Sequence, residues 1–210
     1  MYYNEKTAAR LINSMFRANK NDNREFAHHA YFDKQGRQCA LDGYRAYRLK
    51  KPVAGVPDMD AFKGIDLDKI IPAPATLEKY FVLELPALAD VKTMLAEDNA
   101  AKRRKEEPTF AFTFGLGENG KCLPALNLAY LADMLQMFPD AVARCNAENP
   151  FGPVIFTSPD GDGVLCPVRL KNPNDAITRR KPAPKKDDPC KGLPVYGLRT
   201  FLALAAAANA

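Results

Sequence analysis

The sequence lacks any close pair of cysteines. Its five cysteines lie 21 or more residues apart, at Cys39, Cys122, Cys145, Cys166 and Cys190. No Cys-x-x-Cys pair is present to begin a zinc site, and an odd number does not suggest the disulfide framework of a small secreted protein. We therefore expect free thiols in a reducing compartment.

Long apolar runs are missing as well. The most apolar stretch near the N-terminus is broken by Arg10, Asn13 and Ser14, and the Ala-rich C-terminal end is short and contains Arg199. A membrane-spanning helix needs about 18 or more largely uncharged residues, and no export signal is recognisable. We expect a soluble, cytoplasmic protein with no membrane partner.

Most of the chain carries no excess of positive or of negative charge. Residues 1–170 hold 22 basic and 22 acidic side chains, whereas residues 171–210 hold eight Lys or Arg and three Asp. The net charge of +5 therefore belongs to the C-terminal segment. Binding to nucleic acid cannot be inferred from the pI alone, because it depends on where the charges lie on the fold.

The residue patterns of common enzymes are also missing. His28 and His29 have no Cys or carboxylate at ligand spacing, and we expect them on the two faces of a strand. The turn at 159–163 contains alternating Asp and Gly but lacks the other ligands of a calcium loop, and GLGENG at 115–120 precedes a strand rather than a helix. We expect no catalytic residues, no metal and no cofactor.

The N-terminal part predicts a helix followed by three strands. Apolar residues in 6–18 recur with helical spacing, opposite a polar and partly basic face. Residues 25–33 can form a strand, DKQG and Asp42-Gly43 are turn sequences, and YRAYRLK forms the last strand of an antiparallel meander. The Pro- and Gly-rich run 51–75 is typical of a connector.

The following part predicts strands around two helices. A strand at 77–85 leads to a helix opened by Pro86, and Asn127 is expected to cap a second helix that Pro139 ends. Further strands are expected at 109–116, 141–146, 153–158 and 164–170. The fold class is α+β, with antiparallel sheets and pairs of helices on one face.

Four separated segments resemble the bacterial DNA polymerase III β sliding clamp family. LNLAYLADML at 126–135 and NPFGPVIFTSPDGDGVLCPVRL at 149–170 resemble a helix and the closing strands of its third domain. LDGYR at 41–45 resembles the Thr-Asp-Gly-His-Arg signature of its second domain, and DKIIP at 68–72 resembles the following linker. The segments occur in the family's order, so the resemblance implies a DNA-clamp-like fold.

The resemblance also implies a domain organisation. Residues 1–75 would form a partial clamp-like domain with a connector, and 76–170 a complete one. Residues 171–210 would form a basic, Pro-rich tail with a short Ala-rich helix. A clamp subunit has three domains, so this chain holds about one and a half.

In the family, a groove between the second and third domains binds short peptides of polymerases and other replication proteins. Tyr44 stands where the family usually has His, and Leu41 where it has Thr. The resemblance implies a groove formed by Asp42, Gly43, Tyr44, Arg45, Ala46, Pro72, Val164, Cys166, Pro167, Val168, Arg169 and Leu170.

Clamps contact DNA through phosphates, without reading sequence, by basic residues on their inward helices. The same charges would otherwise serve only as solvated helix faces. The candidates here are Arg10, Arg17, Lys20, Lys92, Lys102, Arg103, Arg104 and Lys105.

These features favour a non-enzymatic processivity or docking factor of DNA replication, encoded by a phage or mobile element, that binds DNA and short peptides of DNA polymerase or related proteins and forms a homo-oligomer. The alternative is a monomeric adaptor or decoy with a clamp fold that does not encircle DNA. A small enzyme is the third hypothesis, although no nucleophile, metal set or phosphate loop supports it.

Overall fold

The computed structural model describes residues 4–59, 65–104, 111–114, 123–149 and 151–168. Its helices are α1 (Glu5–Ala18), η1 (Glu25–Ala27), η2 (Leu67–Lys69), α2 (Pro74–Leu77), α3 (Leu88–Arg103) and α4 (Leu128–Met137). Its strands are β1 (Tyr31–Phe32), β2 (Gln38–Leu41), β3 (Arg45–Leu49), β4 (Phe81–Leu83), β5 (Ala111–Thr113), β6 (Ala125–Asn127), β7 (Val142–Cys145), β8 (Val154–Ser158) and β9 (Gly161–Leu165).

Seven of these strands form one antiparallel sheet in the order β1-β2-β3-β9-β8-β7-β4, and β5 pairs with β6 in a small second sheet. The predicted α+β class with antiparallel sheets is confirmed. Since β3 pairs with β9, the large sheet continues across the expected boundary at residues 75 and 76. The division of the chain into domains remains a prediction.

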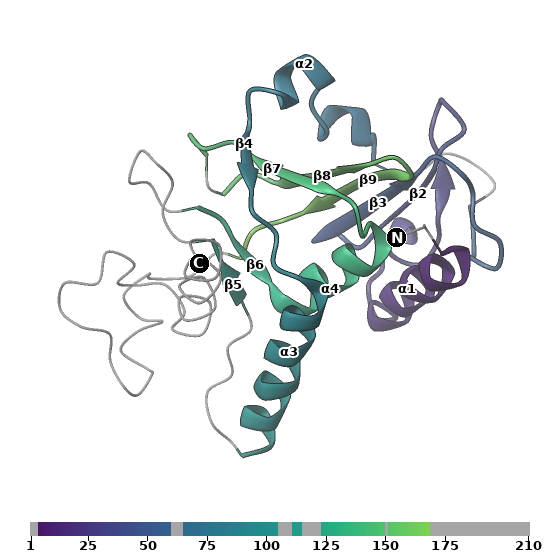
Figure 1. Cartoon of the computed structure of the whole chain (residues 1–210). Coiled ribbons are helices and arrows are strands. Elements are labelled where there is room, and N and C mark those ends of the chain that lie inside the picture. The colour runs from purple at the N-terminus through teal and green to yellow at the C-terminus, as the bar shows by residue number, and fades with distance from the viewer. Residues whose placement is uncertain (1–3, 60–64, 105–110, 115–122, 150, 169–210) are drawn as a thin grey trace.

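One face of the large sheet is covered by helices. Figure 1 shows α1, α3 and α4 on this face, with α3 extending away from the sheet. Inward residues of the strands, such as Tyr47, Phe156 and Leu165, share a buried cluster with Leu11 of α1 and Leu131 of α4. We call α1, α3 and α4 the helix layer. None of the described helices is both long and apolar enough to span a membrane.

The connector covers much of the opposite face. Figure 1 shows α2 and the chain before it on the side of the sheet away from the helix layer. Leu67, Ile71 and Leu77 of this segment pack with Ala46 and Val164, which the strand alternation turns outward. The sheet is therefore buried on both faces around β3 and β9.

Two helices begin at short polar side chains, of which the sequence predicted Asn127. Asn127 accepts hydrogen bonds from the backbone N–H groups of Ala129 and Tyr130 and so caps α4. Asn4 accepts from the N–H of Thr7 and caps α1. At the other end, α4 stops before Phe138 and Pro139, as expected.

Three local expectations were wrong. Residues 25–33 form η1 and the short β1, so His28 and His29 follow a helical turn rather than lying on a strand. The predicted strand 77–85 is reduced to β4, because the end of α2 occupies its start. Gly161 and Gly163 belong to β9 and not to the preceding turn.

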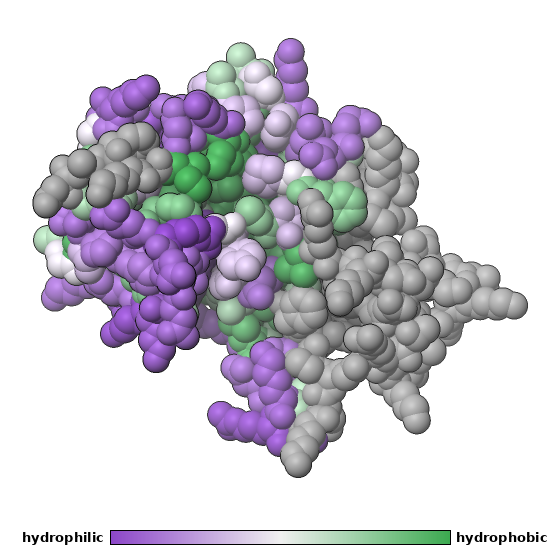
Figure 2. Space-filling model, turned by 180° about the vertical axis from the view of Figure 1, so that it is seen from behind, coloured by the Kyte–Doolittle hydropathy of each residue, from purple (hydrophilic) through white to green (hydrophobic). Residues whose placement is uncertain are grey.

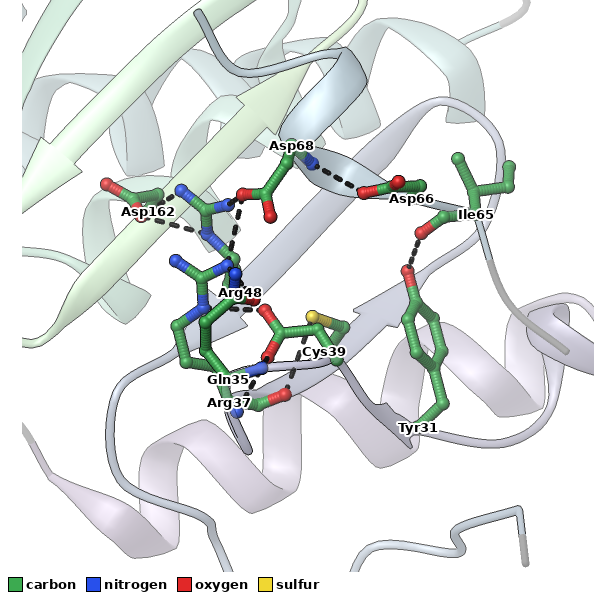
Figure 3. Close-up of polar contacts among 10 residues, drawn as sticks. Tyr31, Gln35, Arg37, Cys39, Arg48, Ile65, Asp66, Asp68 and Asp162 are labelled. Carbon is green, nitrogen blue, oxygen red and sulfur yellow. Dashed lines mark hydrogen bonds and ion pairs between the residues drawn. The ribbon is translucent and has the colours of Figure 1, made fainter. Parts of the chain in front are cut away.

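A cluster of ion pairs fastens the connector to the sheet (Figure 3). Arg48 of β3 donates to Asp162 of β9 at 2.8 Å and to Asp68 of η2 at 2.6 Å. Arg37 donates to the same Asp68 carboxylate at 3.0 Å and to Asp33 at 2.6 Å. Asp68 therefore joins Arg48 of β3 and Arg37, which precedes β2, to the connector.

The environment of Asp68 favours its ionised form. Desolvation works against the carboxylate, but the hydrogen bonds and charges of Arg37 and Arg48 outweigh it and hold the pKa of Asp68 below its usual value. A lowered carboxylate pKa stabilises the fold above the unfolded-state pKa of about 4, and this stabilisation is lost as the pH falls through the folded-state value.

We expect Asp68→Asn to lower the free energy of unfolding at pH 7 by about 1 kcal/mol, since Asp68 is partly exposed but faces the buried Arg48. Urea unfolding should show this difference shrinking below about pH 4. Asp58→Asn is a matched control, because this exposed carboxylate has no side-chain ion pair within the described residues. An equal effect of both substitutions at pH 7 would contradict the role of Asp68.

Candidate functional site

The segments that carry the clamp resemblance meet in space. Leu41, Ile71 and Val164 come from three of these segments and pack in one buried cluster. Ala46 and Val164 are direct partners in the β3–β9 pair. The fourth segment forms α4 and β6, and α4 lies against the other face of the same strands.

Strand alternation divides the predicted groove residues between two faces. Ala46 and Val164 point to the connector side and are buried, whereas Arg45 points to the helix layer. A run of consecutive strand residues therefore cannot line one groove. Arg169 and Leu170 lie outside the described residues, and Pro72 is half-buried in the connector.

Arg45 has ionic partners within the protein. Its side chain is 5% exposed; its Nε donates to Asp42 at 3.0 Å, and its Nη1 donates to Asp133 of α4. Its guanidinium lies 4.4 Å from the centre of the Tyr130 ring. These partners leave Arg45 little surface for a peptide, and they give it a structural role between the β2–β3 turn and α4.

Electrostatics keep this arginine charged. Burial by itself disfavours the cation, but nearby Tyr47 and the carboxylates of Asp42 and Asp133 outweigh it, so the pKa of Arg45 is raised. Asp42 is 1% exposed and also accepts from the backbone N–H groups of Tyr44 and Arg45. The buried cation and the turn geometry thus depend on the same carboxylate.

Tyr130 and Asp133 were not among the predicted site residues. The signal was present in the sequence, because residues three apart share one face of a helix. Their partner was not visible, since the contact to Arg45 spans 88 positions of the chain. Together the two side chains anchor α4 above the β2–β3 turn.

The same end of the sheet exposes aromatic surface. Tyr44 is 58% exposed and lies over Tyr130, with ring centres 6.3 Å apart. Phe151, at 62%, lies in the turn before β8, whose first residue, Val154, pairs with Leu165 at the end of β9. They are the most exposed large apolar side chains of the described residues.

A short segment after β9 continues this surface. The N–H of Cys166 donates to the carbonyl of Tyr44 at 2.8 Å, and the N–H of Val168 donates to Ala125 of β6 at 2.8 Å. Cys166 is exposed, and Pro167 and Val168 are half-buried. We call the surface formed by Tyr44, Tyr130, Phe151 and residues 166–168 the aromatic end.

The predicted DNA-contacting residues that the structure describes all lie on or next to α1 and α3. All seven have exposed side chains: Arg10, Arg17, Lys20, Lys92, Lys102, Arg103 and Arg104. Lys105 lies outside the described residues. Seen from behind, hydrophilic side chains predominate on the side of the molecule where α1 lies (Figure 2). Lys102 is paired with Asp98 at 2.7 Å, which offsets part of the charge on α3.

Comparison with known proteins adds no assignment: no family model, no curated protein and no solved structure matches this chain. Within the described residues, no group of three or more His, Cys, Asp or Glu could hold a metal ion.

We expect Arg45→Met to lower the free energy of unfolding by about 3 kcal/mol, because it leaves the buried Asp42 carboxylate without its cation. The double variant Asp42→Asn/Arg45→Met should lose less than the sum of the single variants, since the two residues interact. Urea unfolding of all three variants measures this coupling. Additive losses would show that the pair does not act as a unit.

Proposed function

We propose that this chain is a clamp-like docking factor of DNA replication. It contacts the DNA backbone through the helix layer and binds a short peptide of a polymerase or another replication protein at the aromatic end. The observation that carries the proposal is the convergence of the resembling segments at β3, β9 and α4. Segments distant in sequence would meet in this way if they formed one docking region.

The chemistry of the aromatic end suits an apolar peptide. Tyr and other aromatic side chains supply much of the binding energy of protein interfaces, because they bury a large area at little cost in entropy. The ring of Tyr44 is supported by Tyr130, whose ring in turn lies over the fixed Arg45. The exposed ring is therefore held in place before a ligand arrives, which lowers the cost of ordering on binding.

We expect Tyr44→Ala to weaken binding of a fluorescently labelled clamp-binding peptide at least tenfold, or by about 1.4 kcal/mol. Fluorescence anisotropy measures the affinity. Phe32→Ala is the matched control, because Phe32 is also exposed but lies at the opposite end of the sheet, where β1 pairs with Gln38. Arg45 variants are unsuitable here, since their effect on folding would obscure their effect on binding.

Failure of the intact protein to bind this peptide at high micromolar concentration would refute docking of this peptide class. Equal affinity of the intact protein and folded Tyr44→Ala would place the docking site elsewhere. Equal losses from Tyr44→Ala and Phe32→Ala would show a general effect of removing surface aromatic side chains.

The ring form of the proposal predicts two further results. The mass in solution should be a closed multiple of the subunit, and the protein should remain on circular DNA but leave linear DNA by sliding off its ends. Gel filtration on nicked circular DNA, before and after linearisation, tests this. A monomer that treats both DNAs alike would favour the adaptor instead of the ring.

A further inference from the structure

Beside α1 lies an open hollow of about 560 Å³ with an unusually uniform charge. Its lining includes Arg10, Arg17 and Lys20, together with the polar side chains of Asn13 and His28. Among the residues that the structure describes, no carboxylate lines it. We call it the α1 hollow.

The cations converge because of their spacing. Arg10, Asn13 and Arg17 lie at i, i+3 and i+7 and therefore share one stripe of α1, opposite the buried stripe that includes Leu11. Lys20 lies two residues after the helix ends at Ala18, beyond the C-cap Asn19. At a rise of about 1.5 Å per residue, Arg10 and Arg17 lie roughly 10 Å apart along the helix axis, and Lys20 follows after the helix end.

These cations are available to a ligand. Within the described part of the chain, Arg17 and Lys20 have neither a hydrogen bond nor an ion pair from their side chains, and Arg10 contacts only the amide oxygen of Gln136, at 3.2 Å. The nearby carboxylate of Asp22 is already paired with Arg24 at 2.5 Å. The neighbouring side chains therefore offset little of the positive charge of the α1 hollow.

The basic residues of α3 lie in a different setting. Lys102 forms an ion pair with Asp98, and the acidic residues Asp90 and Glu97 share the helix with Lys92 and Arg103. Opposite charges interleaved on one helix weaken its attraction for an anion. The two rows of cations are therefore unequal.

We propose that the α1 hollow binds a run of phosphate groups, such as a nucleic-acid backbone presents, and that α1 rather than α3 makes the principal contact. This inference rests on the proposed DNA binding and assigns it to a site. Phosphates of one duplex strand follow each other about every 3.4 Å along the axis, so a row of roughly 10 Å or more faces several of them. The side chains of Asn13 and His28 are already hydrogen-bonded to the backbone oxygens of Gly55 and Asp22, so the three cations carry the proposed contact.

The test compares three double variants that each remove two positive charges. Arg17→Ala/Lys20→Ala changes the α1 hollow, and Lys92→Ala/Arg103→Ala changes α3. Lys34→Ala/Lys79→Ala removes two exposed lysines outside the helix layer. Binding of a short labelled DNA duplex is measured by anisotropy over a series of KCl concentrations, after circular dichroism has shown that each variant is folded.

We expect the α1 variant to bind at least about tenfold more weakly at low salt, and the salt dependence, log K against log[KCl], to lose about two units of slope. The α3 variant should lose clearly less, and the control should bind like the intact protein. An α1 variant that binds like the control, beside an intact protein that binds DNA, would overturn this inference and leave the proposed function standing.

A second experiment uses inorganic polyphosphate, because it offers phosphate groups without bases or sugars. Displacement of the duplex by polyphosphate from the intact protein, but not from the α1 variant, would support recognition of the phosphate groups themselves. Binding of polyphosphate at the α1 hollow without any binding of duplex would support the site but refute the proposed DNA contact. Binding of neither would overturn both.

Discussion

The antiparallel pairing of β3 with β9 is the interaction on which the rest of the structure depends. It aligns Arg45 with Leu165 at one end and Leu49 with Gly161 at the other, and so joins segments more than 100 residues apart. Alternation along β3 then distributes its side chains. Tyr47 and Leu49 enter the core beneath the helix layer, while Arg48 turns to the connector. One strand thus supplies the core, the connector contacts and, through Arg45, the link to α4.

The glycines of β9 allow this strand to lie close to β3 and to α4. A Cβ on Gly161 would lie 2.3 Å from the carbonyl oxygen of Arg48, and one on Gly163 would lie 2.2 Å from the Sδ of Met134. Both distances are far below van der Waals contact, so Gly161 lets β9 lie close to β3 and Gly163 lets α4 approach the sheet. Because Asp133 adjoins Met134 on α4, this approach also brings its carboxylate to Arg45.

Local patterns predicted local structure well and long-range structure poorly. The apolar spacing of α1 and the capping role of Asn127 are properties of a few neighbouring residues, and both were confirmed. The sequence around Gly161 and Gly163 resembles a turn, and only the packing against Arg48 of β3 and Met134 of α4 shows why glycine is needed within a strand. Burial of Arg45 also escaped prediction, because its partner Asp133 is distant in sequence. The resemblance placed consecutive strand residues in one groove, although successive side chains of a strand point to opposite faces of the sheet.

The charge of the body illustrates why composition is a weak guide to binding. Residues 1–170 are neutral as a whole, yet several carboxylates form ion pairs at the sheet, among them Asp162 with Arg48 and Asp33 with Arg37. An ion pair cancels the field of both partners at a distance, so these acids do little to offset cations elsewhere. The exposed basic stripe of α1 can therefore attract an anion even though the body carries no net charge. The distribution of partners, rather than the pI, sets the surface potential that a ligand meets.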